Sequence, residues 1–327
     1  SSSFRLLGAM GAQHSMTMRR WDFAAAYLQG SLLPGEVIYC SPPPGYEYKD
    51  PHGNPRVDSR GNPLLCKVIK PIYGMAQSGR RWQRTIFPYF IKQGFTQCDH
   101  DSCLFHKRVT RSTPSGPRDE IIIIGCYVDD LFILSTHTDE HSVYTEFTNQ
   151  LQKDWDVDDE GPVQDLLNVE ISRDGPDVLL KQSAYIEKMM TQFAPDARTH
   201  LPRNQPPSSP DLAQLVTDAL VCTDTIDPAL LRRYQSLVGA LLYCTTQTRP
   251  DCAYAVGMLC RCMAKPTERL YAAALRVLYY LYVHKDVGLR YSPSSTPLSG
   301  MSDSDWAVKH STSCLLYTSD AADEASS

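Results

Sequence analysis

The segment 127–130 constrains the chain most, because it sets two adjacent aspartates between two apolar runs. It reads YVDD, with an apolar run at 121–124 before it and another at 131–134 after it. Short apolar runs around a polar pair are typical of a β-hairpin with buried arms. Asp129 and Asp130 therefore lie at the tip of a predicted hairpin, where a rigid turn could hold a divalent cation. The alternative is an ordinary turn, in which Asp is common.

A third acid, Asp22, stands at the end of a short apolar segment, and an aromatic residue, Tyr27, follows it five residues later. Between these residues and the hairpin, 73–82 reads YGMAQSGRRW, which is punctuated by glycine and basic. Asp22 alone says little, because a lone Asp is more often a cap or a turn residue. Tyr27 alone is more often an ordinary buried aromatic residue.

The net charge of −5 at first argues against a nucleic-acid partner, because Lys and Arg supply most non-specific affinity for phosphate. The charge is unevenly distributed. Nine Lys and Arg face two Asp between residues 67 and 111, whereas 154–165 is strongly acidic. A basic band beside an acidic cluster suits a nucleic-acid cleft, and a solvated basic surface is the alternative.

The composition indicates a globular protein with room for two domains, since 42% of the 327 residues are hydrophobic and 21% are charged. No apolar run approaches the roughly 18 residues that a membrane span needs, so we expect no membrane partner. The Ser-rich start does not have the pattern of a signal peptide. Eleven scattered cysteines then favour reduced thiols in the cytosol or nucleus.

In their order and spacing these motifs resemble the reverse transcriptase of copia-type long-terminal-repeat retrotransposons, over most of residues 4–313. The matching segments, each followed by the family pattern, are 22–30 DFAAAYLQG (D-V-K-T-A-F-L-N-G), 43–46 PPGY (P-P-G-F/Y), 72–82 IYGMAQSGRRW (L-Y-G-L-K-Q-A-P-R-x-W), 127–130 YVDD (Y-V-D-D), 234–243 YQSLVGALLY (Y-R-S-L-V-G-x-L-x-Y) and 248–251 TRPD (T-R-P-D). Any one match could arise by chance, but the set in this order could hardly do so.

The resemblance implies an RNA-directed DNA polymerase, which joins a primer 3′-hydroxyl to the α-phosphate of a deoxynucleotide. It implies that Asp22 and Asp129 bridge two Mg²⁺ ions, for which Mn²⁺ could substitute, and that Asp130 is the supporting acid. The implied partners are an RNA template, a DNA primer, dNTPs and other segments of the retrotransposon polyprotein. The implied location is the cytoplasm, within a virus-like particle, with the nucleus as a second location.

The resemblance also implies three substrate-binding residues. The ring of Tyr27 would lie beneath the sugar and exclude a 2′-hydroxyl by steric contact. Gln77 would lie near the nucleotide and the template base, and Arg80 would contact substrate beside it.

The chain departs from the family pattern at several positions. Ala76 replaces a lysine, which removes one cation, and Ser78-Gly79 replaces Ala-Pro. Asn168 replaces the glycine of L-G-(I/V)-E. If that backbone needs a positive φ, the cost is local strain, although Asn tolerates this conformation better than most residues.

We therefore expect an α/β (α+β) fold, with a reverse-transcriptase-like palm of antiparallel sheet and packing helices followed by a small helical connection unit. Helical patterns lie at 82–95, 140–153, 185–193, 230–245, 251–263 and 267–284. The expected domains begin with the palm at 1–200, with its fingers largely missing at the N-terminus, followed by a Pro-rich linker at 201–228 and the helical connection at 229–292. A truncated start of an RNase H-like domain follows at 293–313, with its acid Asp303. The tail at 314–327 resembles a translated sequencing adapter and is excluded from fold reasoning.

Three other interpretations remain open. The chain could be a degenerate, inactive retroelement fragment that retains only nucleic-acid binding. An unrelated metal-dependent phosphohydrolase would explain the acids but not Tyr73-Gly74 or the segment 249–251. A zinc site is suggested by Cys98, His100, Cys103 and His106, but their spacing is short for a zinc finger, and packing explains them better.

Overall fold

The computed structural model describes residues 2–46, 48–114, 116–197, 201, 204–223 and 225–295. Asp303 and the tail 314–327 lie outside these residues, so the structure says nothing about the predicted nuclease acid or the tail. The chain up to Pro293 forms one compact unit.

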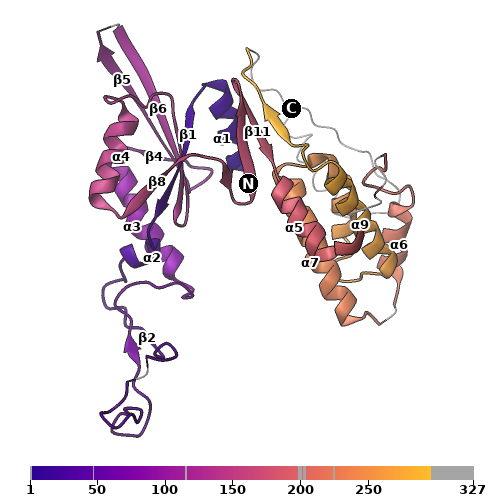
Figure 1. The fold of residues 1–327 in the computed structure, drawn as a ribbon, viewed down its shortest axis with the longest axis horizontal. Coiled ribbons are helices and arrows are strands. Elements are labelled where there is room, and N and C mark those ends of the chain that lie inside the picture. The colour runs from indigo at the N-terminus through magenta and orange to yellow at the C-terminus, as the bar shows by residue number, and fades with distance from the viewer. Residues whose placement is uncertain are drawn as a thin grey trace, which may run out of the picture. The chain divides into compact units, whose positions relative to one another are not determined.

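An antiparallel sheet of six strands, in the order β4-β5-β6-β7-β1-β8, forms the centre of the N-terminal part (Figure 1). Its strands are β1 (Thr17–Phe23), β4 (Thr96–Gln97), β5 (Leu104–Thr113), β6 (Gly116–Tyr127), β7 (Asp130–Ser135) and β8 (Val157–Pro162). The strand nearest the N-terminus, β1, is inserted between β7 and β8. The expected mixed α/β fold with an antiparallel sheet is confirmed.

Alternate residues of the central strands enter two different cores, as the pleat of a strand requires. Ile122 and Ile124 of β6 join a core with helices α3 (Ser78–Lys92) and α4 (Val143–Asp154). Ile123, between them, joins a core on the opposite face with helix α1 (Ser2–Gln13). Because both faces are covered, β6 and β7 read as continuous apolar runs.

A second antiparallel sheet, in the order β12-β11-β10-β9, contributes to the core on the α1 face. Its strands are β9 (Asp165–Leu166), β10 (Val169–Asp174), β11 (Asp177–Lys181) and β12 (Leu289–Tyr291). The turn between β9 and β10 consists of Leu167 and Asn168, whose φ angles are 52° and 58°. Asn168 thus adopts the left-handed conformation that the family's glycine suggested, and Asn is among the residues that tolerate it.

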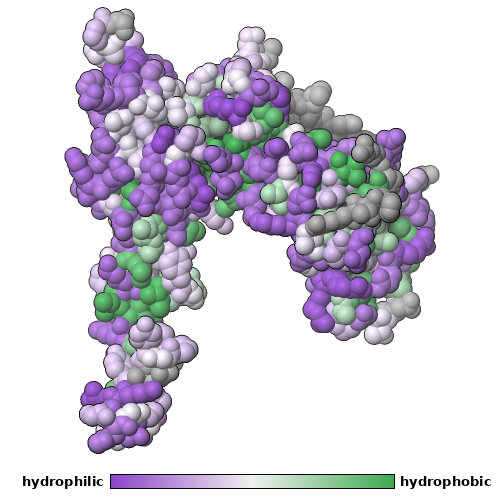
Figure 2. Space-filling model, in the orientation of Figure 1, coloured by the Kyte–Doolittle hydropathy of each residue, from purple (hydrophilic) through white to green (hydrophobic). Residues whose placement is uncertain are grey.

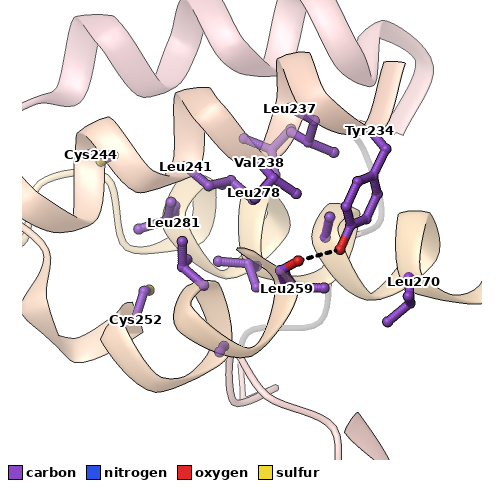
Figure 3. Packing of buried hydrophobic residues seen from close by; sticks show 14 of the residues in the cluster. Tyr234, Leu237, Val238, Leu241, Cys244, Cys252, Leu259, Leu270, Leu278 and Leu281 are labelled. Carbon is purple, nitrogen blue, oxygen red and sulfur yellow. Dashed lines mark hydrogen bonds between the residues drawn. The ribbon is translucent and has the colours of Figure 1, made fainter. Parts of the chain in front are cut away.

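The C-terminal helices enclose a separate core (Figure 3). They are α5 (Ser183–Phe193), α6 (Leu212–Val221), α7 (Pro228–Gln247), α8 (Ala253–Cys260) and α9 (Glu268–Val283), with short 3-10 turns η1 (Pro195–Ala197) and η2 (Pro250–Cys252). Fully buried Tyr234 donates its hydroxyl to the Leu259 carbonyl at 2.8 Å, which ties α7 to α8. Among the described residues, no helix combines the length and apolarity needed to cross a bilayer.

Two of the expected boundaries need correction. The range 201–228 is not a linker throughout, because α6 lies within it and buries Leu212, Leu215 and Val216 in the helical core. Their i, i+3, i+4 spacing forms an apolar stripe once the proline-rich stretch has ended. Helix α5, placed with the palm at 1–200, packs its stripe of Ile186, Met189 and Met190 into the same helical core.

The segment that follows β1 contains little regular structure. It includes helix α2 (Ala26–Gln29) and the strand pair β2 (Tyr39–Cys40) and β3 (Cys66–Lys67). Two turns between these strands repeat one design, in which the Asp50 and Asp58 carboxylates each accept backbone N–H groups two and four residues later. Apolar surface gathers next to α2 in Figure 2, and the exposed apolar side chains of this segment include Leu28, Leu33, Val37 and Ile69.

Candidate functional site

The two aspartates of YVDD lie at the tip of a hairpin, as predicted. Tyr127 and Asp130 pair across the turn between β6 and β7, and Val128 within the turn has a φ of 55°. A β-branched residue at positive φ is strained, so neighbouring structure must hold it. Buried Trp82 of α3 supplies this support, because its indole N–H donates to the Val128 carbonyl at 2.7 Å.

Strand β1 brings the third acid to the same place. Asp22 is directly opposite Asp130 in the β1–β7 register, and the Phe23 N–H donates to the Asp129 carbonyl at 2.9 Å. Opposite residues in an antiparallel pair have Cα atoms about 4.5–5.5 Å apart. The expected convergence of the three acids is therefore present.

Negative charge is crowded at this site. Burial raises the pKa of Asp22 above its ordinary value, and the neighbouring carboxylates of Asp130, Glu160 and Asp129 raise it further. The Oδ1 atom of Asp129 is buried and has no hydrogen-bond partner among the described residues. A divalent cation would relieve both the crowding and the unpaired oxygen, so the carboxylates of Asp22 and Asp129 fit such an ion.

Asp130 differs from the other two acids because it forms an ion pair with Arg20. The guanidinium lies 2.8 Å from the Asp130 carboxylate, 3.0 Å from Glu160 and 3.6 Å from Asp165. Because this ion pair directs Asp130 to Arg20, Asp22 and Asp129 are the two acids of the site that form no ion pair among the described residues. In the described ranges, no group of three or more His, Cys, Asp or Glu side chains is arranged to hold a metal ion by itself. The suggested zinc ligands Cys98, His100, Cys103 and His106 therefore form no such group either.

Two tyrosines connect the acids to the segment before α3. Tyr73 donates its hydroxyl to Oδ2 of Asp129 at 2.6 Å, and its ring centroid lies 4.5 Å from that of Tyr27. Burial and then the bond to Asp129 raise the pKa of Tyr73 to about 12, so the hydroxyl keeps its proton at neutral pH and donates it in this hydrogen bond. Tyr27, the predicted sugar-contacting residue, thus reaches the acids through Tyr73.

The other two predicted substrate residues, Gln77 and Arg80, lie at the start of α3. Gln77 precedes the helix and hydrogen-bonds to Glu36, whose pKa falls to about 2 chiefly through its bond to Arg81. Arg80 is exposed. Within the described part of the chain, neither Gln77 nor Arg80 forms a hydrogen bond to the three acids.

Two of the departures from the family pattern fit their surroundings. Ser78 is fully buried, and its hydroxyl donates to the Ile72 carbonyl at 2.6 Å. A Cβ added at Gly79 would meet the Tyr27 hydroxyl at 3.4 Å, so the small residue leaves that hydroxyl room. Ser78 therefore supports the local turn, and Gly79 leaves space beside Tyr27.

The basic band is partly neutralised. Arg81 pairs with Glu36, Arg108 with Asp119, and Arg111 with Glu146. The other six cations of the band form no ion pair with a described residue. They are Lys67, Lys70, Arg80, Arg84, Lys92 and Lys107. The remaining positive charge is smaller than the residue count suggested.

Sequence reasoning missed Arg20 and Tyr73 as parts of the site. Arg20 could have been found, because it stands two residues before Asp22 on a strand and so projects from the same face. Tyr73 lies 56 residues from Asp129. Its contact with that acid depends on how the turn before α3 packs, which no local pattern reveals.

Comparison with known proteins shows which family the chain resembles. The family model described as reverse transcriptase (RNA-dependent DNA polymerase) matches residues 1–200. The chain is 30% identical over 308 residues to the Retrovirus-related Pol polyprotein from transposon RE1 of Arabidopsis thaliana, covering 94% of this chain and 19% of that protein. It is 27% identical over 311 residues to the Retrovirus-related Pol polyprotein from transposon TNT 1-94 of Nicotiana tabacum, covering 94% of this chain and 21% of that protein.

The chain thus spans about a fifth of the length of these polyproteins. No solved structure gives a significant match. The family match covers more than half of the chain and includes all three acids of the hairpin site. The chain belongs to the reverse transcriptase (RNA-dependent DNA polymerase) family, in the copia-type group represented by these retrotransposon polyproteins.

Proposed function

We propose that this chain contains the palm of an RNA-directed DNA polymerase, which extends a DNA primer on an RNA template by two-metal nucleotidyl transfer from dNTPs. Asp22 and Asp129 are the proposed ligands of Mg²⁺ or Mn²⁺, and Asp130 supports them from its ion pair with Arg20. When bound, the metal ions would lower the pKa of the primer hydroxyl and stabilise the entering and leaving oxygens.

One observation carries the proposal: carboxylates from two adjacent strands meet at one end of the sheet, and a buried oxygen of Asp129 has no partner in the part of the chain that the structure describes. Mg²⁺ takes only one or two carboxylates and completes its shell with water and substrate phosphates. The pair Asp22 and Asp129 is therefore sufficient. Tyr27 and Tyr73 lie beside it, where the sugar and base of a nucleotide would be expected.

Primer extension tests the proposal directly, with poly(rA) as template, oligo(dT) as primer, and dTTP with Mg²⁺. The substitution Asp129→Asn keeps the size of the side chain but removes the charge, and we expect it to reduce extension at least about a hundredfold. Asp218→Asn is the matched control, since Asp218 is an exposed residue of α6 that accepts a bond from Gln214. Equal extension by Asp129→Asn and the control would refute the assignment.

The proposal also assigns roles to the remaining parts of the chain. The helical unit would be the connection that follows the polymerase, and Asp303 would be the first acid of an RNase H-like domain. Gln77 and Arg80 would contact substrate from the start of α3. The partners would be other segments of a retrotransposon polyprotein, and the location would be a virus-like particle in the cytoplasm and then the nucleus.

The second candidate is an inactive fragment that still binds nucleic acid. The loss of the family's lysine at Ala76 favours it, because a cation is missing next to the nucleotide site. Binding of the poly(rA)–oligo(dT) hybrid without any extension by the wild-type chain would favour this candidate. Release of phosphate from small esters would instead favour a phosphohydrolase.

A further inference from the structure

We propose that the Tyr73 side chain occupies the nucleotide's place between Tyr27 and Asp129. It must leave Asp129 when the cation and the dNTP bind. This inference rests on the proposed function, because it concerns the same acids. It adds a residue whose side chain blocks the proposed nucleotide site.

The hydroxyl of Tyr73 is bound to the acid that the cation needs. Its 2.6 Å bond to Oδ2 of Asp129 is short and charge-assisted. The other oxygen of that carboxylate is the buried atom without a partner. Tyr73 thus provides the only hydrogen bond to the Asp129 carboxylate within the described residues, and a cation on both oxygens would have to compete with it.

The ring of Tyr73 covers the surface on which the sugar would lie. Its centroid is 4.5 Å from that of Tyr27, with an angle of 33° between the ring planes. A sugar inserted between the rings would need two contacts of about 3.5–4 Å each, or roughly 7 Å in total. The two rings are too close for this, so Tyr73 and a bound sugar exclude each other on that side of Tyr27.

The surroundings allow the Tyr73 side chain to move while its backbone stays. The preceding residue is anchored, because the Ile72 carbonyl accepts the bond from buried Ser78. The next residue, Gly74, has a φ of 90° and nothing within 4 Å of the place where a Cβ would stand. Since half of the Tyr73 surface is exposed, rotation about its own side-chain bonds can carry the ring into solvent.

The role of the Tyr73 hydroxyl is tested by measuring how tightly the whole chain binds Mn²⁺. The decrease of the EPR signal of the free ion reports the binding. Tyr73→Phe removes the bond to Asp129 and keeps the ring, and we expect it to bind Mn²⁺ about threefold to tenfold more tightly than the wild type. The matched control is Tyr89→Phe, which removes the same kind of bond, 3.1 Å long, from Asp154. This control should leave Mn²⁺ affinity unchanged.

Binding of dTTP in the presence of Mn²⁺ tests the ring. Tyr73→Ala removes both the hydroxyl and the ring, so it should bind dTTP more tightly than Tyr73→Phe does. Tyr73→Phe should in turn bind dTTP more tightly than the wild type does. Weaker dTTP binding by Tyr73→Ala than by the wild type would show that the ring is a contact of the bound nucleotide, and would overturn the proposal.

The proposed metal site and the proposed role of Tyr73 can fail separately. If Asp129→Asn binds Mn²⁺ as well as the wild type does, the metal site itself is wrong. If Asp129→Asn loses Mn²⁺ but Tyr73→Phe and the wild type bind it equally, the proposed function stands and the role of Tyr73 is wrong. Thermal unfolding of each variant verifies that the compared chains are folded.

Discussion

The indole N–H of Trp82 and the carbonyl of Val128 are joined by a 2.7 Å hydrogen bond that fixes the YVDD turn from the side of helix α3. Val128 has a positive φ, which is costly for a β-branched residue, and the bond satisfies its carbonyl. The position of both aspartates therefore depends on a helix that begins about 50 residues earlier in the chain.

Replacing this tryptophan should weaken both the fold and the site. Trp82→Phe removes the bond and leaves a small cavity, and we expect it to lower the free energy of unfolding by about 2–3 kcal/mol in urea titration. Trp155→Phe is the comparison, because Trp155 packs on Trp82 in the same core but its indole N–H bonds to none of the described residues. A loss in Trp155→Phe as large as in Trp82→Phe would contradict a specific role for the bond.

Arg20 should balance the acidic cluster. Arg20→Gln leaves Asp130, Glu160 and Asp165 without their shared cation, and we expect a loss of up to about 1 kcal/mol that grows at low salt. Added Mg²⁺ should raise the melting temperature of this variant more than that of the wild type.

The control for Arg20 is its neighbour on the opposite face of β1. Arg19→Gln breaks a single pair with Asp159, at 2.5 Å. This variant should gain no extra stabilisation from Mg²⁺, and an equal gain in both variants would mean that the effect is not local to the acids.

Arg249 and Asp251 should produce a pH-dependent stability of the helical unit. Arg249 is 1% exposed, pairs with Asp251 at 2.7 Å and donates to the His284 carbonyl. Burial opposes ionisation of Asp251, but the hydrogen bond and charge of Arg249 outweigh it, so the pKa of Asp251 lies below its ordinary value of 3.8. A lowered pKa in the folded state means that the stabilisation is present above about pH 4 and is lost as pH falls through the folded pKa.

Asp251→Asn measures this contribution. At pH 7 we expect a loss of about 2–3 kcal/mol in urea titration, less than for a fully buried pair because Asp251 is partly exposed. The difference from the wild type should shrink below about pH 4. Glu268→Gln, which breaks the exposed pair with Arg233, should barely change stability at either pH.

Tyr27 should control the choice of sugar. Tyr27→Ala removes the ring that would contact the 2′ position, and we expect the preference for dTTP over UTP to fall about tenfold to hundredfold in single-nucleotide incorporation. Tyr27→Phe retains the ring and should keep the preference. Unchanged discrimination in Tyr27→Ala would place the sugar elsewhere.

The sequence by itself determined the elements whose pattern is local. The apolar runs around YVDD predicted the hairpin, and the helical periods predicted α3, α4, α7 and α9, because periodic burial is written in neighbouring residues. Motif order also predicted that Asp22 would join the hairpin acids. The sequence did not predict α6, because the prolines before it obscured its apolar stripe.

Only the tertiary structure decided the contacts between segments that are distant along the chain. The β1–β7 register sets Asp22 against Asp130, and a shift of one residue would turn Asp22 to the other face. The bond from Tyr73 to Asp129 and the ion pair of Arg20 with Asp130 depend on that same packing. The contacts of Asp22 and Arg20 follow from strand order and register, and the contact of Tyr73 follows from the packing of the turn before α3. All three are set by the whole core and by no single motif.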